Sequence, residues 1–84
     1  MYVYVVEMVS RVKVTGGERY RIISTGIGGV YASKKKAIQE IRKAFPAVLL
    51  DDDINTKDVT RYYTKPNRDG YCGSYTIYRR RIAL

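Results

Sequence analysis

Apolar and polar residues alternate along the start of the chain, which predicts a long β-strand from Tyr2 to Val14. The even positions of this segment are apolar nearly throughout, so we expect this face to meet the core. The odd positions are apolar at first and charged later, ending with Arg11 and Lys13. This pattern predicts that the first half of the strand is covered on both faces.

Paired glycines follow this strand and predict a tight hairpin. The turn is expected at Thr15-Gly16-Gly17-Glu18, because glycine adopts the positive φ angles that short hairpin turns require. Arg19 to Thr25 is then expected to be a second strand, antiparallel to the first. Gly26-Ile27-Gly28-Gly29 is expected to break this strand, with a short extended segment at residues 30–31.

A helical period begins after Ser33, which is a good N-cap residue. The spacing predicts a helix over Lys34 to Phe45, and Pro46 ends it. Its apolar stripe consists of Ala37, Ile38, Ile41, Ala44 and Phe45. Its opposite side carries Lys35, Lys36, Gln39, Arg42 and Lys43. The helix should therefore bury one side and present a basic stripe on the other.

The second half of the chain predicts another hairpin. A short apolar stretch at residues 47–50 leads into an acidic turn at residues 51–53. Val59 to Lys65 is expected to be the third strand and Tyr71 to Ile82 the fourth, joined by a loop of strong turn formers at residues 66–70. The prediction is one α+β domain over residues 1–84, with a four-stranded antiparallel sheet and one helix in the order ββαββ.

One helix can cover only one face of such a sheet. The other face should be open and should carry several of the nine tyrosines together with some arginines. An exposed aromatic face of this kind is typical of a dimer interface or a partner site. A homodimer through the uncovered face is one expectation, and a different partner on that face is the alternative.

The chain is strongly basic, with 16 Lys and Arg against 8 Asp and Glu and a net charge of +8. This balance suits nucleic acid, a nucleotide, an acidic protein surface or an anionic membrane, and the alternative is that the charge serves solubility alone. No apolar run is long enough to span a bilayer, and the start of the chain lacks the pattern of a signal peptide. We therefore expect no membrane partner and a cytoplasmic location.

Catalytic residue types are scarce. The chain has no histidine, which is the commonest general base near neutral pH and the commonest metal ligand. Its one cysteine, Cys72, has no histidine to activate it and no second cysteine for an intramolecular disulfide, so it fits a small strand residue in a reducing compartment. The sequence predicts no enzyme, no catalytic residue and no cofactor.

The acidic segment resembles part of a calcium-binding loop. Asp51, Asp53 and Asn55 have the spacing of its first three ligands. Thr56 stands where the sharp turn needs glycine, and Tyr62 stands where the loop needs a bidentate glutamate. We therefore expect a solvated acidic turn and no metal site.

Two groups of residues are candidate binding surfaces. The helix stripe supplies Lys35, Lys36, Arg42 and Lys43. The last strand supplies Tyr71, Tyr75, Arg79 and Arg81, which alternation places on one face. Tyrosines beside arginines suit stacking and charge contacts with single-stranded nucleic acid, a protein hot spot, or simple protection of a sheet edge by charge. A glycine-rich loop before a lysine-rich helix start also fits an anion contact, with a solvated helix end as the alternative.

Two segments together resemble small, uncharacterised α+β domains found mainly in phages and prophages. These segments are the opening strand Tyr4-Val5-Val6-Glu7 and the helix start Gly29-Val30-Tyr31-Ala32-Ser33-Lys34-Lys35-Lys36-Ala37. The similarity covers the first half of the chain and departs after Pro46. It implies a setting, because small phage accessory proteins often bind and block host factors, and it carries no functional residues over.

Two functions follow as hypotheses. In the first, the protein is a non-enzymatic phage accessory module that binds and inhibits a host protein or ribonucleoprotein with an acidic surface, for example in an anti-CRISPR or other anti-defence role. In the alternative, it binds nucleic acid or a nucleotide directly. Salt separates the two, because direct nucleic-acid binding weakens steeply as salt rises.

Overall fold

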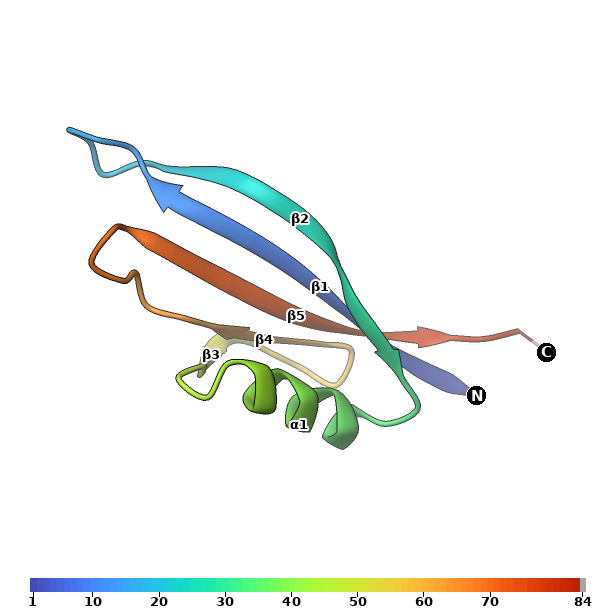
Figure 1. Cartoon of the computed structure of the whole chain (residues 1–84). Coiled ribbons are helices and arrows are strands. Elements are labelled where there is room, and N and C mark those ends of the chain that lie inside the picture. Colours follow the sequence, from blue (N-terminus) through green and yellow to red (C-terminus); the bar gives the residue numbers. More distant parts are fainter. Residues whose placement is uncertain (84) are drawn as a thin grey trace.

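Five antiparallel strands form one sheet and a helix packs on one face of it, in a computed structural model that describes residues 1–83 (Figure 1). The elements are β1 (Tyr2–Lys13), β2 (Tyr20–Tyr31), α1 (Lys34–Ala44), β3 (Leu49–Asn55), β4 (Val59–Tyr63) and β5 (Tyr71–Arg81). The spatial order is β2-β1-β5-β4-β3, so the first and last strands are neighbours inside the sheet. Both ends of the chain lie at the same end of the molecule, where the Ile82 N–H donates to the Met1 carbonyl at 2.9 Å (Figure 1).

The α+β class and the single helix predicted from sequence are confirmed for the described residues, but the order is ββαβββ rather than ββαββ. The additional strand is β3, in the segment where an acidic turn was expected. Leu50 pairs with Tyr62 and Asn55 pairs with Thr60, while the ladder is irregular between them. Acidic residues are tolerated here because β3 is an edge strand, and charge on an edge discourages pairing with other chains.

The prediction of a glycine-rich break in the second strand is wrong, because β2 continues through Gly26–Gly29 as far as Tyr31. The pairing with β1 shifts register at this point, which accommodates one extra residue in β2 as a β-bulge. A Cβ on Gly28 would lie 2.6 Å from the Met8 Sδ, so the glycine allows β2 to approach the core side chains of β1 closely. The glycine-rich segment before the helix is therefore part of β2 rather than a loop, and the anion contact expected at the helix start stays a prediction.

Helix α1 begins as predicted and ends one residue early, at Ala44 instead of Phe45. The Ser33 Oγ accepts a hydrogen bond from the Lys36 N–H at 3.1 Å, which caps the first turn. Ala37 and Ile41 are buried against the sheet, as the apolar stripe predicted. Phe45 follows the helix and packs on the same core.

The two faces of the sheet differ sharply. The even positions of β1 face α1, and Val6 lies in a core with Ile77 of β5 and Ile41 of the helix. The odd positions face away from the helix, and Figure 1 shows no other described element on that side. The expectation that the first half of β1 is covered on both faces is therefore wrong, because Val3 and Val5 are only half-buried within the chain.

Candidate functional site

The sheet face opposite α1, called the open face below, is covered by no other described element (Figure 1). Side chains alternate along each strand, and paired residues share a face, so the register defines its members. In β1 and β5 these are Val3, Val5, Glu7, Val9, Arg11, Lys13, Cys72, Ser74, Thr76, Tyr78 and Arg80. In β2 and β4 they are Tyr20, Ile22, Thr25, Ile27, Val30, Val59, Arg61 and Tyr63.

Two arginines reach toward β5 from opposite sides of the open face. Arg11 of β1 donates through Nη1 to the Ser74 Oγ at 3.1 Å, and Arg61 of β4 donates through Nε to the Thr76 Oγ1 at 2.9 Å. Ser74 and Thr76 are 6% and 1% exposed although no secondary-structure element covers them. The two arginines are therefore held over β5. Each hydrogen bond uses one N–H donor of a guanidinium, so most donors of each arginine lie outside these two contacts.

Tyrosines border the same part of the open face. Tyr63 of β4 pairs with Ser74 of β5, the residue that anchors Arg11. Tyr20 extends from β2, and together with Arg61 these side chains line a shallow hollow of about 370 Å³. Lys65 and Pro66 complete its rim. This volume lies within the range of small-molecule sites, about 300–1,000 Å³.

Neither Arg11 nor Arg61 forms an ion pair with a carboxylate in residues 1–83. Among the residues that the structure describes, the ion pairs are Lys36–Glu40 and Arg79–Asp58, and neither involves an arginine of the open face. On this face β1 contributes one acidic residue, Glu7, and two cations, Arg11 and Lys13. The hollow is therefore an electropositive surface with aromatic walls.

The other end of the open face is mainly apolar. Val5 pairs with Val30 on one side and with Tyr78 on the other, and Tyr78 pairs in turn with Val59. Arg80 stacks over the Tyr78 ring at 4.9 Å from its centroid. Exposed aliphatic side chains also gather on the edge strand β2, of which Ile27 is 72% exposed. The homodimer expected from sequence would use this end, and it stays a prediction.

The structure corrects the placement of the tyrosine and arginine set predicted on the last strand. Alternation places Tyr71, Tyr75, Arg79 and Arg81 on one face, but that face is the one covered by α1. Tyr75 is 6% exposed and its ring stacks on Phe45 with centroids 4.4 Å apart. Burial raises the pKa of the Tyr75 phenol. Tyr75 is thus a core residue rather than a contact residue of an open surface.

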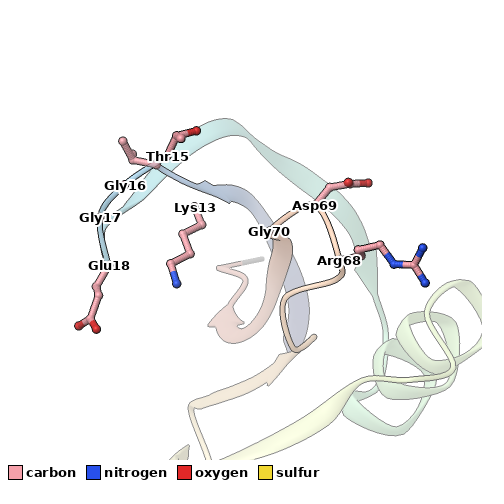
Figure 2. A pocket seen from close by; sticks show the side chains of 9 residues that line it. Lys13, Thr15, Gly16, Gly17, Glu18, Arg68, Asp69 and Gly70 are labelled. Carbon is pink, nitrogen blue, oxygen red and sulfur yellow. The ribbon is translucent and has the colours of Figure 1, made fainter.

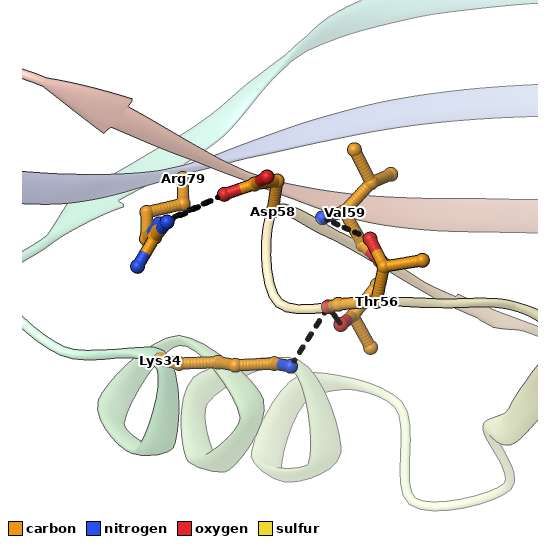
Figure 3. Close-up of polar contacts among 6 residues, drawn as sticks. Lys34, Thr56, Asp58, Val59 and Arg79 are labelled. Atoms are coloured by element: carbon orange, nitrogen blue, oxygen red, sulfur yellow. Dashed lines mark hydrogen bonds and ion pairs between the residues drawn. The ribbon is translucent and has the colours of Figure 1, made fainter.

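The Arg79 side chain makes its contacts within the chain. Its Nη2 lies 2.7 Å from the Asp58 Oδ1, and its guanidinium carbon stacks 4.2 Å from the centroid of the Tyr2 ring. Figure 3 shows the ion pair beside the turn that joins β3 to β4, where the Lys34 Nζ also donates to the Thr56 carbonyl at 3.4 Å. These contacts fasten the β3–β4 turn to β5 and to the helix.

Tyr71 and Arg81 are exposed but lie at opposite ends of β5. Arg81 is ten positions after Tyr71, and a strand rises about 3.3 Å per residue, so their Cα atoms are roughly 33 Å apart. The four residues therefore do not assemble into one site.

The helix cations are exposed as expected, and several make contacts within the chain. The Lys36 Nζ lies 3.0 Å from the Glu40 Oε1, and this hydrogen bond, with the charge of Lys36, lowers the pKa of Glu40. The Arg42 guanidinium lies over the Tyr62 ring at 5.5 Å from its centroid. Lys35 and Lys43 face solvent on the outer side of the helix. The stripe exists, but the ring that Arg42 covers, Tyr62, is itself buried.

A further hollow, of about 510 Å³, lies between the β1–β2 and β4–β5 loops (Figure 2). The Lys13 N–H donates to the Gly70 carbonyl at 3.0 Å, which ties the two loops together. Figure 2 shows the charged side chains of Glu18, Arg68 and Asp69 pointing in different directions rather than toward one centre. This hollow therefore offers no convergent binding groups.

The remaining candidate chemistry is sparse in the part of the chain that the structure describes. Asp51 and Asp53 belong to β3, where the Asp53 N–H donates to the Asp51 Oδ1 at 3.0 Å. Residues 1–83 contain no group of three or more acidic or cysteine side chains arranged to hold a metal ion. Cys72 is a half-buried thiol on the open face. No helix within residues 1–83 has the length and apolar character needed to cross a membrane.

Comparison of the chain with protein-family models, with curated proteins and with solved structures finds no match in any of the three. The candidate site must therefore be judged from its own geometry. Its two central residues, Arg11 and Arg61, were not predicted from the sequence, because they are far apart in the chain. The available signal was their position among apolar and aromatic strand residues, where an arginine on a sheet face is unusual.

Proposed function

We propose that this protein is a non-catalytic binding module that recognises a negatively charged partner through the open face of its sheet. The observation that supports this most strongly is the pair Arg11 and Arg61, fixed by hydroxyl groups of β5 on an uncovered face and not ion-paired with a carboxylate of residues 1–83. The net charge of +8 adds long-range attraction for such a partner.

The open face is favoured over the helix stripe for a physical reason. Binding costs less free energy when the contacting side chains are already ordered, because less rotamer freedom is lost on association. Arg11 and Arg61 are anchored at 3.1 Å and 2.9 Å in the free protein. Lys35 and Lys43 are long exposed side chains that a partner would have to order. The helix stripe then serves mainly to raise the association rate.

The resemblance of the first half of the chain to phage domains supplies a setting for this proposal. In that setting the partner is a host protein or ribonucleoprotein in the host cytosol, and occupation of its anionic surface would inhibit it. An anti-defence role is the most specific form of this hypothesis. The proposed function requires no catalysis, and it rests on no general acid, general base or nucleophile.

A matched pair of charge reversals tests which surface binds. Arg11→Glu with Arg61→Glu, and Lys35→Glu with Lys36→Glu, change the net charge equally but on different surfaces. The probes are a labelled single-stranded RNA of about twelve nucleotides and a polyglutamate of similar length, followed by fluorescence anisotropy at low salt. The open-face pair should weaken polyanion binding at least about tenfold, because two oriented cations become repulsive. The helix pair should have a much smaller effect.

Circular dichroism and thermal melting must show that each variant is folded. Because Arg11 and Arg61 cover buried hydroxyls, the exposed pair Lys13→Glu with Lys65→Glu provides a second variant at the same region. If the helix pair abolishes binding and the open-face variants do not, the helix is the interface and the proposal is wrong. If neither polyanion binds the wild-type protein, the charge serves solubility alone.

A further inference from the structure

Resting on the function proposed above, we infer that the partner of the open face is single-stranded nucleic acid, with an unstacked base received against Tyr63 and the adjoining backbone held by Arg11 and Arg61. Three features of the hollow carry this inference. They are its charge, the orientation of its arginines and the aromatic ring between them.

Charge complementarity narrows the occupant to a polyanion. The hollow is lined by three positively charged side chains, Arg11, Arg61 and Lys65. Lys13 follows Arg11 on the same face of β1, two residues nearer the hairpin. This arrangement is a basic track rather than a single point, and a phosphate backbone supplies the repeating negative charge that fits a track.

The orientation of the arginines favours phosphate and base edges. Ser74 and Thr76, which anchor them, lie two residues apart on one face of β5, a separation of about 7 Å. A guanidinium has five N–H donors in a rigid plane and pairs bidentately with phosphate oxygens or with base edges. Each arginine uses one N–H donor for the hydrogen bond to its hydroxyl anchor. The remaining donors of the planar guanidinium are in position for a second, external partner.

The aromatic ring favours a single strand over a duplex. Tyr63 pairs with Ser74, so its ring lies beside the anchor point of Arg11 and one pair away from Arg61. Stacking on a tyrosine needs a flat, exposed base, which a single strand offers and a duplex hides. Because tyrosine and arginine also serve in protein hot spots, polyglutamate is the probe that stands for an acidic protein in the test below.

Binding of four related probes tests the inference. These are a labelled single-stranded RNA of about twelve nucleotides, an abasic strand of equal length, the same RNA in a duplex, and polyglutamate. The base-bearing single strand should bind at least about fivefold more tightly than the abasic strand, which is the smallest effect expected from stacking one base. The duplex should bind less tightly than the single strand, because its bases are not available to Tyr63.

Variants at Tyr63 identify the source of that preference. Tyr63→Val removes the ring while keeping a residue that suits a strand, and Tyr63→Phe is the matched control that keeps the ring. Tyr63→Val should lower affinity for the base-bearing strand at least about fivefold and leave affinity for the abasic strand unchanged, whereas Tyr63→Phe should resemble wild type. Thermal melting of both variants provides the check on folding.

The possible failures are distinguishable. If polyglutamate or the abasic strand binds as tightly as the base-bearing strand, or if Tyr63→Val changes nothing, this inference is overturned, while the proposed anion-binding function stands. If Arg11→Glu with Arg61→Glu and Lys13→Glu with Lys65→Glu also leave every probe unaffected, the proposed function fails as well. Tighter binding to the duplex than to the single strand would likewise overturn the inference.

Discussion

Replacement of Tyr75 with alanine should cost about 3–5 kcal/mol of folding free energy, the range measured for removal of a buried aromatic side chain. Tyr75 is 6% exposed and stacks on Phe45 in the core between β5 and the helix. A domain of 84 residues has a total stability of roughly 4–13 kcal/mol. Urea denaturation should therefore show a midpoint far below that of the wild-type protein, and a wild-type stability near the low end of this range would leave the variant unfolded at room temperature.

Tyr75→Phe is the matched control, because it keeps the stacked ring and removes only the hydroxyl. It should retain most of the wild-type stability. If Tyr75→Ala melts like wild type but loses a partner, Tyr75 is a contact residue and the core described above is wrong. Loss of binding in Tyr75→Ala is informative only after its folding has been measured.

The second large effect is the dependence of RNA binding on salt. For single strands the slope of log affinity against log salt is about −0.7 for each phosphate neutralised. Four cations, Arg11, Lys13, Arg61 and Lys65, give a slope of about −2.8, so a change from about 50 mM to about 200 mM salt should weaken binding roughly fiftyfold. Anisotropy titrations of the twelve-nucleotide RNA at several salt concentrations measure this slope.

Neutral substitutions give the control for the salt effect. Arg11→Gln with Arg61→Gln should reduce the steepness of the slope by about 1.4, because two phosphate contacts are lost. The matched change Lys35→Gln with Lys36→Gln should leave the slope nearly as it was. A slope close to zero in the wild-type protein would contradict binding through these cations.

The helix and the first hairpin could be predicted from sequence because their signals are local. The period of the apolar residues located the buried stripe of α1, and Ser33 caps the helix as its position predicted. The glycines gave the turn correctly, and Gly16 has a φ of +80°. Local signals were misleading at Gly28, where a glycine permits close approach to Met8 inside a continuous strand instead of breaking it.

The candidate site could not be predicted, because it depends on which strands are neighbours. Alternation grouped Tyr75 and Arg79 correctly on one face of the last strand, but it could not say which face of the sheet that was. The register decides this point, since Tyr75 pairs with Met8 and Arg79 with Tyr4, and both of these partners face the helix. Only the order β1-β5-β4 brings Arg11 and Arg61 to either side of the same strand.

The edge strand β3 was missed for a related reason. Aspartate is depleted in strands, and three aspartates follow one another in this segment, so local propensity favours a turn. The strand is stabilised instead by the pairing of Leu50 with Tyr62, because both side chains belong to or pack against the core. The ladder is irregular across those residues, which shows where the local preference still acts.

The most direct test of the open face as the binding surface is an amide chemical-shift titration of the folded protein with the twelve-nucleotide single-stranded RNA. We expect the largest shifts at Arg11, Arg61 and Tyr63 and at the β5 residues beneath them, Ser74 and Thr76. The amides of Lys35, Lys36 and Lys43 on the outer side of the helix should move little. Shifts confined to the helix, with the amides of the open face unchanged, would contradict the proposed binding surface.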